Sequence, residues 1–142
     1  MAENKVTLNI DGKDVTVEKG TTVLQAAQQL NIHIPTLCYL KDVQAIGACR
    51  VCCVEVKGQR NLAASCVLPV TEGLVVLTNS PIAREARKLT VELLLSDHEM
   101  NCPTCGRNLN CELQALANQL GIRDIPYQGA KSPTVIDESS PS

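Results

Sequence analysis

Aromatic side chains are almost absent from this sequence of 142 residues. Tyr39 and Tyr127 are the only ones, with no Phe and no Trp. The core must therefore be built from aliphatic side chains, and the chain lacks the aromatic rows on which nucleic-acid bases stack. Its net charge of -2 is close to balanced, so it gives no support for a nucleic acid or an anionic membrane surface as partner.

Long apolar runs are also missing, and none approaches the ~20 residues that a membrane-spanning helix needs. The amino-terminal MAENKVTL is polar and has no apolar segment of the kind found in secretory leaders. The sequence therefore predicts a protein without a transmembrane segment, located in the reducing cytoplasm. Thiols stay reduced there, so we do not interpret the eight cysteines as a disulfide framework.

The sequence does contain cysteines at the spacing of metal ligands. Cys38, Cys49, Cys52 and Cys66 form the pattern C-x10-C-x2-C-x13-C. A C-x2-C pair brings two thiolates together within one turn of backbone, and two further thiols complete a four-sulfur set that suits zinc or an iron–sulfur cluster. The intervening residues are mostly small or apolar, which lets backbone N–H groups approach a bulky inorganic core. The pattern favours an iron–sulfur cluster.

A second possible ligand set lies nearer the carboxyl terminus. His98, Cys102, Cys105 and Cys111 form the pattern H-x3-C-x2-C-x5-C, which is a complete set of four ligands. From the residues alone, structural zinc and an iron–sulfur cluster fit it equally well. An isolated histidine at this place would more simply interact with the end of the preceding helix, but the three cysteines that follow favour His98 as a ligand.

Cys53 directly follows Cys52, so the choice of ligand between them needs an argument. Cys52 keeps the C-x2-C interval to Cys49, whereas Cys53 would point to the opposite face of a strand. We interpret Cys53 as a buried thiol that is not a ligand, because a free cysteine commonly packs as a small hydrophobic residue. A ligand swap onto Cys53 is the alternative.

The periodicity of apolar residues predicts the regular elements. A hairpin with Asp11-Gly12 as its turn is expected first, then a short helix on whose apolar face Val23, Ala26, Ala27 and Leu30 lie. Strands are predicted over residues 5–10, 13–18, 51–57 and 74–78, with a possible short strand over 60–64.

Two further helices are predicted in the second half of the chain. The first covers 81–96, begins after Ser80 as cap, and carries Ile82, Ala86, Leu89 and Leu93 at helical spacing. The second runs from 111 to 120 and ends at a glycine. The first helix carries the basic residues Arg84, Arg87 and Lys88. They are most simply a solvated face, with a docking patch for an acidic partner as the alternative.

Several segments together resemble one family of redox proteins. PTLCYL, GACRVC, VEV and HEMNCPTCGRNLNCELQ are similar to the amino-terminal iron–sulfur region of [FeFe] hydrogenases, with the NAD(P)-linked, electron-bifurcating type favoured, and of the large iron–sulfur subunit of complex I. The first cysteine loop is similar to that of plant-type [2Fe–2S] ferredoxins with its first interval lengthened. The resemblance covers residues 5–122 and implies two clusters: a [2Fe–2S] cluster held by Cys38, Cys49, Cys52 and Cys66, and a [4Fe–4S] cluster held by His98, Cys102, Cys105 and Cys111.

The same resemblance implies an α+β fold class in two domains. A β-grasp [2Fe–2S] ferredoxin-like domain is expected over residues 1–79, and a small helical domain with the histidine-ligated [4Fe–4S] cluster over 80–122. Residues 123–142 are expected to be a linker or tail. Because no cysteine follows Cys111, we do not expect a hydrogen-activating site in this chain. We interpret the chain as a fragment of a longer protein, with a free-standing electron carrier as the alternative.

The expected function is electron transfer without a catalytic site of its own. No nucleophile arrangement remains once the ligands are assigned, and the sequence has no glycine-rich phosphate loop. The two clusters would relay electrons between an NADH dehydrogenase-like flavoprotein and a terminal site elsewhere, such as a hydrogenase active site, in a multisubunit complex that also holds small iron–sulfur subunits. A complex I subunit or an NAD-linked formate dehydrogenase is the nearest alternative, and a zinc-stabilised interaction domain is an alternative of another class.

Overall fold

The computed structural model describes residues 4–133, 135 and 139 of the chain. Its larger part is a mixed five-stranded sheet in the order β2-β1-β5-β3-β4. β1 pairs antiparallel with β2 and parallel with β5. The strands are β1 Lys5–Ile10, β2 Lys13–Glu18, β3 Cys53–Val56, β4 Ala63–Ala64 and β5 Val75–Leu77.

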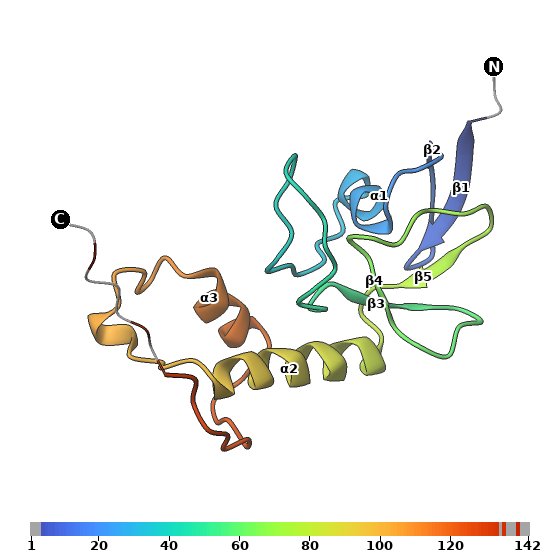
Figure 1. Ribbon diagram of the computed structural model, residues 1–142. Helices are drawn as coiled ribbons and strands as arrows, with labels where there is room; N and C mark the ends of the chain where they lie inside the picture. The colour runs from blue at the N-terminus through green and yellow to red at the C-terminus, as the bar shows by residue number, and fades with distance from the viewer. Residues whose placement is uncertain (1–3, 134, 136–138, 140–142) are drawn as a thin grey trace.

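The helices lie around this sheet as the α+β prediction requires. Figure 1 shows α1 (Val23–Gln29) above the strands β3 and β5, and α2 (Pro81–Ser96) below them. A hairpin and a helix followed by a long loop and a returning strand make the β-grasp arrangement, so the predicted fold class is confirmed. A 3-10 turn, Cys102–Thr104, and the helix α3, Glu112–Gln119, complete the carboxyl-terminal part.

The first hairpin forms where the sequence predicted it. Asp11 and Gly12 both have positive φ, +50° and +83°, which a two-residue hairpin turn requires. The Asp11 carboxylate then accepts hydrogen bonds from the backbone N–H of Thr78, at 2.8 Å, and from the Thr78 hydroxyl. The turn is therefore tied to the segment that leads from β5 into α2.

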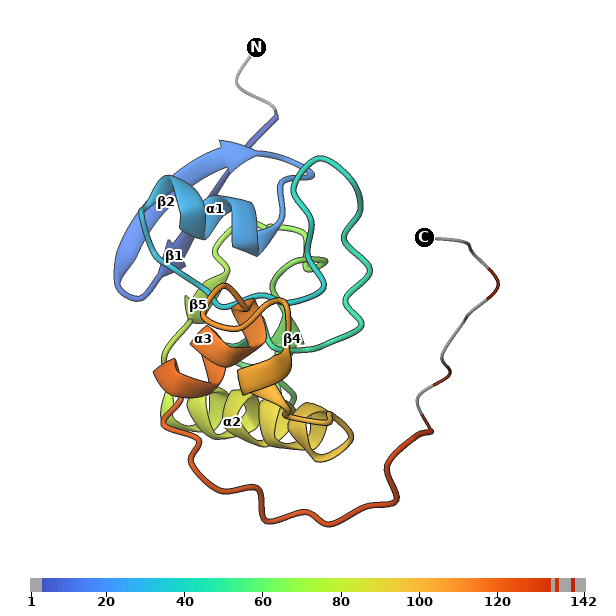
Figure 2. The same ribbon diagram turned by 90° about the vertical axis from the view of Figure 1, so that its left-hand side faces the viewer.

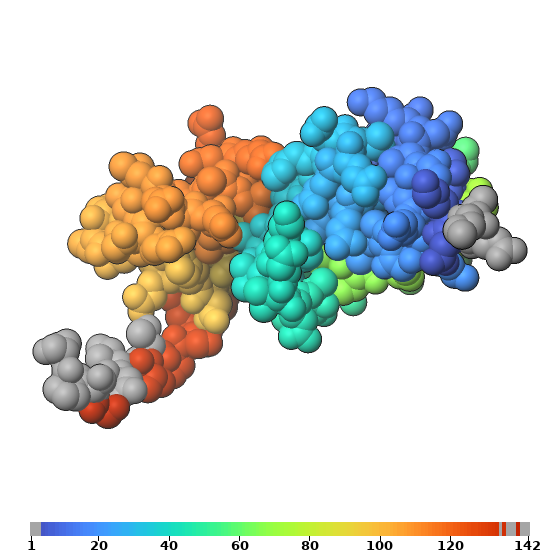
Figure 3. Space-filling model, turned by 90° about the horizontal axis from the view of Figure 1, so that it is seen from above, coloured from blue at the N-terminus to red at the C-terminus, as the bar shows by residue number. Residues whose placement is uncertain are grey.

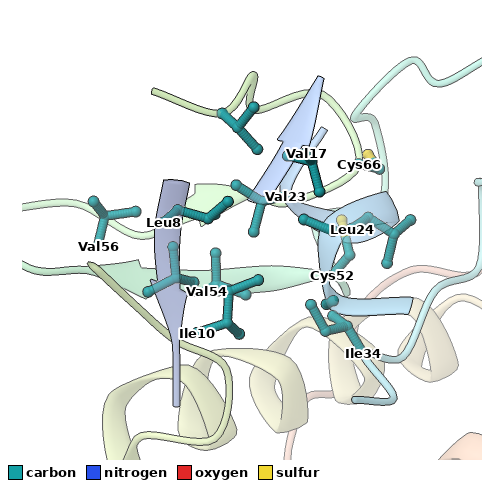
Figure 4. Close-up of a cluster of buried hydrophobic side chains, with 14 of the residues drawn as sticks. Leu8, Ile10, Val17, Val23, Leu24, Ile34, Cys52, Val54, Val56 and Cys66 are labelled. Atoms are coloured by element: carbon teal, nitrogen blue, oxygen red, sulfur yellow. The ribbon is translucent and has the colours of Figure 1, made fainter. Parts of the chain in front are cut away.

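The core beneath α1 is aliphatic, as the lack of aromatics predicted. Figure 4 shows how side chains from the hairpin, α1 and β3 fill it, and burying each such Val, Leu or Ile side chain contributes roughly 1.5–3 kcal/mol. The Thr22 hydroxyl and the Gln25 side chain form a capping box that begins α1. The largest of the fully buried core side chains are Leu8, Ile10, Val23, Leu24, Val54 and Val76.

Three predicted strands are shorter than expected. β3 begins at Cys53 rather than at residue 51, because Arg50 has a positive φ of +61° and the Cys53 N–H donates to the Arg50 carbonyl at 3.2 Å. This turn ends the cysteine loop before the strand starts. β4 retains two residues of the possible 60–64 strand, and β5 three residues of the predicted 74–78 strand.

The bounds of α2 match the prediction, but the apolar residues that showed helical spacing do not form its buried face. Ile82, Leu89 and Leu93 are 58%, 42% and 50% exposed. The buried residues instead follow a spacing of four: Ala83, Arg87, Val91 and Leu95. Two different neighbours cover this face. Ala83 and Arg87 contact Cys53 of β3, whereas Val91 and Leu95 pack in one cluster with Leu116 of α3.

The prediction that Arg87 belongs to a solvated basic face is also wrong. Its side chain is only 4% exposed. One Nη donates to the carbonyl of Cys53, at 2.7 Å, and to that of Thr78. Arg84 and Lys88 are exposed as predicted.

A second, smaller core joins the helical part to the first cysteine loop. Val51 is fully buried against Val91 and Leu95 of α2 and Leu116 of α3, with Cys49 partly buried at its edge. Figure 2 shows α3 lying over α2, and in Figure 3 the two parts form one continuous surface. The helical part is therefore seated directly on the loop that carries the first cysteines.

The chain leaves α3 without further regular structure through residue 133. Gly121, with a φ of +67°, follows the end of α3 as predicted. Ser132 returns to the end of α2, where its N–H donates to Asp97 Oδ1 at 2.7 Å. The predicted tail is thus extended over its described part, and its DESSPS ending lies largely outside the described residues. No described helix is long and apolar enough to span a bilayer.

Candidate metal centres

The first candidate site is built by one long loop and the residue that follows β4. The loop between α1 and β3 presents Cys38, Cys49 and Cys52, and Cys66 follows β4. The Cys49 N–H donates to Cys38 Sγ at 3.5 Å. Cys52 and Cys66 are each 1% exposed, and both lie at the Leu24 end of the core in Figure 4. Two sulfurs are thus buried and two lie nearer the surface.

The electrostatics of the thiols link the four residues. Burial raises the pKa of the Cys66 thiol to about 12, with further contributions from its hydrogen bond to Cys52 and from the charges of Cys52 and Cys38. At Cys49, partial burial acts to raise the pKa, but hydrogen bonds from the backbone at Val51 and Cys38 lower it overall. Backbone donors of this kind would stabilise a bound cluster.

The cysteine loop owes its close wrap to residues in the left-handed region. Gly47 has a φ of +63°, and a Cβ built on it would lie 3.0 Å from Cγ2 of Val67, next to Cys66. Arg50, between Cys49 and Cys52, also has a positive φ. The lengthened first interval forms a small turn that projects from the surface, with a bridge between Leu40 and Gln44.

Gly47→Ala should weaken this loop. We expect it to lower the free energy of unfolding by about 1–2 kcal/mol for the left-handed conformation, with a further loss from the contact with Val67. Chemical denaturation of the cluster-loaded protein measures this. Gly58→Ala is the matched control, because Gly58 has a φ of +89° but nothing within 4 Å of its Cβ position. Equal losses in the two variants would contradict the close approach to Val67.

The second candidate site surrounds a cavity. A space of about 300 Å³ is lined by all four predicted ligands, His98, Cys102, Cys105 and Cys111. His98 directly follows the end of α2, the 3-10 turn begins at Cys102, and Cys111 caps α3. Met100 and Leu109 have positive φ at the two bends of the connecting loop, so the backbone turns around this space.

The donor set of the second site is judged from its chemistry. The four side chains line one cavity, and three soft thiolates with one imidazole are suited to the iron of an iron–sulfur cluster. The donor set and the space therefore fit a [4Fe–4S] core.

The two candidate sites are neighbours. One pocket is lined by Cys38 and Cys49 of the first site and by His98 of the second, with Leu37, Leu94 and Leu113 between them. Sequence spacing gave no sign of this proximity. It arises because α2 and α3 pack against Val51 of the cysteine loop.

Cys53 lies outside both sites, on the other face of β3. It is 5% exposed, and its thiol approaches the carbonyl of Ala83 in α2 at 3.7 Å. Burial raises its pKa, although the charge of Arg87 acts in the opposite direction. The prediction that it is a buried thiol is confirmed, and its exclusion from the ligand set stays a prediction.

Fold and sites together define a class of protein: an iron–sulfur protein in which a β-grasp domain is followed by a small histidine- and cysteine-rich helical region. The chain belongs to the family of 2Fe-2S iron–sulfur cluster binding domains, whose model matches residues 3–81. Residues 87–126 match the NADH-ubiquinone oxidoreductase-G iron–sulfur binding region. The predicted cofactors, a [2Fe–2S] and a [4Fe–4S] cluster, are thereby confirmed, and the chain is an iron–sulfur electron-transfer module.

Its relatives are subunits of NAD(P)-linked oxidoreductases. It is 50% identical over 132 residues to the HndD subunit of the NADP-reducing hydrogenase of Solidesulfovibrio fructosivorans, covering 89% of this chain and 22% of that protein. It is 45% identical over 131 residues to a subunit of the NADH-quinone oxidoreductase of Streptomyces coelicolor, covering 91% and 16%. It is 41% identical over 125 residues to the gamma chain of the NAD-reducing hydrogenase HoxS of Cupriavidus necator, covering 87% and 53%.

A solved structure supports the same grouping. The crystal structure of an NAD+-reducing [NiFe]-hydrogenase in the H2-reduced state matches with a TM-score of 0.88 and 33% identity. The match covers 96% of this chain and 57% of that chain. The predicted resemblance to hydrogenase and complex I subunits is confirmed, while this chain spans about a fifth or less of the first two relatives.

Proposed function

We propose that this chain relays single electrons between a subunit that handles flavin and NAD(P) and a terminal acceptor site located elsewhere. The [2Fe–2S] cluster would be held by Cys38, Cys49, Cys52 and Cys66, and the [4Fe–4S] cluster by His98, Cys102, Cys105 and Cys111. The observation that carries the proposal is the pocket lined by Cys38, Cys49 and His98. Ligands of two clusters on one wall would bring both redox centres close enough for direct electron transfer.

The relatives support the two ends of this relay. Their names include NADP-reducing hydrogenase, NADH-quinone oxidoreductase and NADPH-Fe(3+) oxidoreductase, so nicotinamide is common to them while the second substrate differs. We propose that the module takes part in the electron exchange with nicotinamide, and that a hydrogenase site is its terminal acceptor. The complex would be cytoplasmic and would also contain an NADH dehydrogenase-like flavoprotein and small iron–sulfur subunits. The equivalent module of complex I is the second candidate, favoured by the match over residues 87–126.

The residues of this chain prepare the sites for that role. When bound, the clusters supply one-electron redox chemistry. The backbone N–H of Cys49 and the positive φ at Gly47 and Arg50 orient the first loop around its centre. Burial of Cys52 and Cys66 excludes water from one side, while partly exposed Cys38 and Cys49 leave a route toward the second site.

The complex purified without oxygen should show this relay directly. We expect about six irons per copy of this chain from the two clusters, and reduction of both when NADH or NADPH is added. Because the sites are neighbours, the electron paramagnetic resonance (EPR) signals of the two reduced clusters should broaden or split by mutual magnetic interaction, and Cys38→Ser should remove that interaction. A colourless protein that holds zinc, or two clusters without magnetic interaction, would contradict the proposal.

A further inference from the structure

We infer that Arg87 is a positioning residue that sets the reduction potential of the [2Fe–2S] cluster, through a buried positive charge held behind Cys52. The inference rests on the proposed function, because it takes Cys52 as a ligand. The cysteine motifs do not explain why the Arg87 side chain is buried. Three observations about Arg87 carry it: its burial, its hydrogen bonds and its charge balance.

The first observation is burial of a group that rarely becomes buried. Arg87 is 4% exposed at the contact between α2 and β3. Arginine is almost never fully buried without a partner, because removing a guanidinium from water is costly. A hydrophobic side chain at this position, between Ala83 and Val91 of the same helix face, would pack without that cost. The charge therefore needs a counterpart.

The second observation is where the guanidinium points. One Nη donates to the carbonyl oxygens of Cys53 and Thr78. The Cys53 residue is bonded to Cys52 through a peptide unit, and β3 begins at this position. Arg87 thus fixes the backbone on the side of β3 opposite the core, while the Cys52 thiol lies on the core side. The Arg87 guanidinium and the Cys52 thiol are close enough to interact electrostatically.

The third observation is that, among the described residues, no carboxylate forms an ion pair with Arg87. Among the described residues the ion pair given by the geometry is Lys88 with Glu92, and Arg87 forms none. The Asp11 carboxylate interacts with Arg87 only at longer range and is hydrogen-bonded to Thr78. The Arg87 Nε has no hydrogen-bond partner among the described atoms. The other groups whose charge acts on Arg87 are the neighbouring thiols of Cys53 and Cys52.

A [2Fe–2S] cluster would supply the missing counter-charge. Two ferric ions, two sulfides and four thiolates together form an anion, and one-electron reduction adds another negative charge to it. A fixed cation in a low-dielectric interior stabilises the more negative form most. Arg87 therefore favours the reduced cluster and raises its potential, which is one of the protein's means of tuning such clusters. The [4Fe–4S] site, beyond the far end of α2, is affected less.

The test is a redox titration of the cluster-loaded protein, followed by EPR. Arg87→Met removes the charge and keeps the length of the side chain. We expect it to lower the equilibrium constant for reduction of the [2Fe–2S] cluster about tenfold, which is about 59 mV for one electron, and to shift the [4Fe–4S] potential less. Arg87→Lys keeps a positive charge, so its [2Fe–2S] potential should stay close to that of the unmodified protein. Arg84→Met, at an exposed position of the same helix, should have no effect.

A purely structural role for Arg87 predicts a different result. It predicts a lower melting temperature for Arg87→Met with an unchanged [2Fe–2S] potential, and that outcome would overturn the inference. If Arg87→Met does not fold with its clusters, Arg87→Gln and Arg87→Lys are compared instead, since both keep a donor for the carbonyls of Cys53 and Thr78. Equal potentials in these two variants would overturn it equally. Absence of a [2Fe–2S] cluster from the unmodified protein would instead reject the proposed function.

Discussion

Cys66→Ser is expected to remove the [2Fe–2S] cluster and to leave the [4Fe–4S] cluster in place. Cys66 is 1% exposed, is hydrogen-bonded to Cys52 and has a pKa raised to about 12 by burial. A ligand must give up its proton to bind the metal, and a serine hydroxyl is deprotonated far less readily than a thiol. The hydroxyl oxygen is also a harder donor than sulfur, which the iron of such clusters prefers. We expect iron to fall from about six to about four atoms per chain.

The chain offers a matched control for this prediction in Cys53. It is buried to a similar degree and also lies in the β3–β4 region, but its thiol faces α2 and contacts the Ala83 carbonyl. Cys53→Ser should retain both clusters, with full iron and sulfide content and an unchanged visible spectrum. If Cys53→Ser loses the [2Fe–2S] cluster while Cys66→Ser keeps it, the ligand set is wrong.

The strands and helices were largely predictable because each has a short-range signal. Asp11-Gly12 determines a hairpin turn through its two positive φ angles, and Thr22 and Ser80 cap helices through bonds to residues three positions later. Alternation in the hairpin places Leu8 and Ile10 in the core without reference to the rest of the chain. Such features are decided within a few residues, so one sequence suffices to find them.

The buried face of α2 was not predictable from apolar spacing, because its neighbours decide it. A stripe of Ile82, Leu89 and Leu93 is the more hydrophobic one, yet it stays exposed. The helix is oriented by Ala83, whose small side chain lets α2 approach Cys53, and by Arg87, whose Nη reaches two carbonyls. The sequence does contain a signal for the buried face, a spacing of four that joins Ala83, Arg87, Val91 and Leu95. The charged Arg87 within this row instead indicated an exposed face.

The proximity of the two sites has the same origin. Val51 lies between Cys49 and Cys52 in the sequence, and it becomes part of the second core only when α2 and α3 fold back onto it. The identity of the metal was also undecidable from the second motif alone, since zinc and iron accept the same ligands. The match to a 4Fe-4S family resolves that choice.

The histidine ligand gives the second prediction with a large expected effect. His98→Ala should lose the [4Fe–4S] cluster, with iron falling from about six to about two atoms per chain, because His98 lines the cavity with Cys102, Cys105 and Cys111. His98→Cys should rebuild a four-ligand set. In place of a neutral imidazole it supplies a thiolate, so the cluster becomes more negative and harder to reduce, as histidine ligation raises potentials elsewhere.

Redox titration of His98→Cys should show this as a fall of the [4Fe–4S] equilibrium constant for reduction by tenfold or more, about 59 mV for each factor of ten. The other histidine, His33, is exposed and lines neither candidate site, so His33→Cys is the matched control and should leave both potentials unchanged. Full iron content and an unshifted potential in His98→Ala would mean that His98 only follows the end of α2. His98 also lines the pocket shared with Cys38 and Cys49. A lowered potential of the [4Fe–4S] cluster in His98→Cys should therefore also slow electron transfer to it from the [2Fe–2S] cluster.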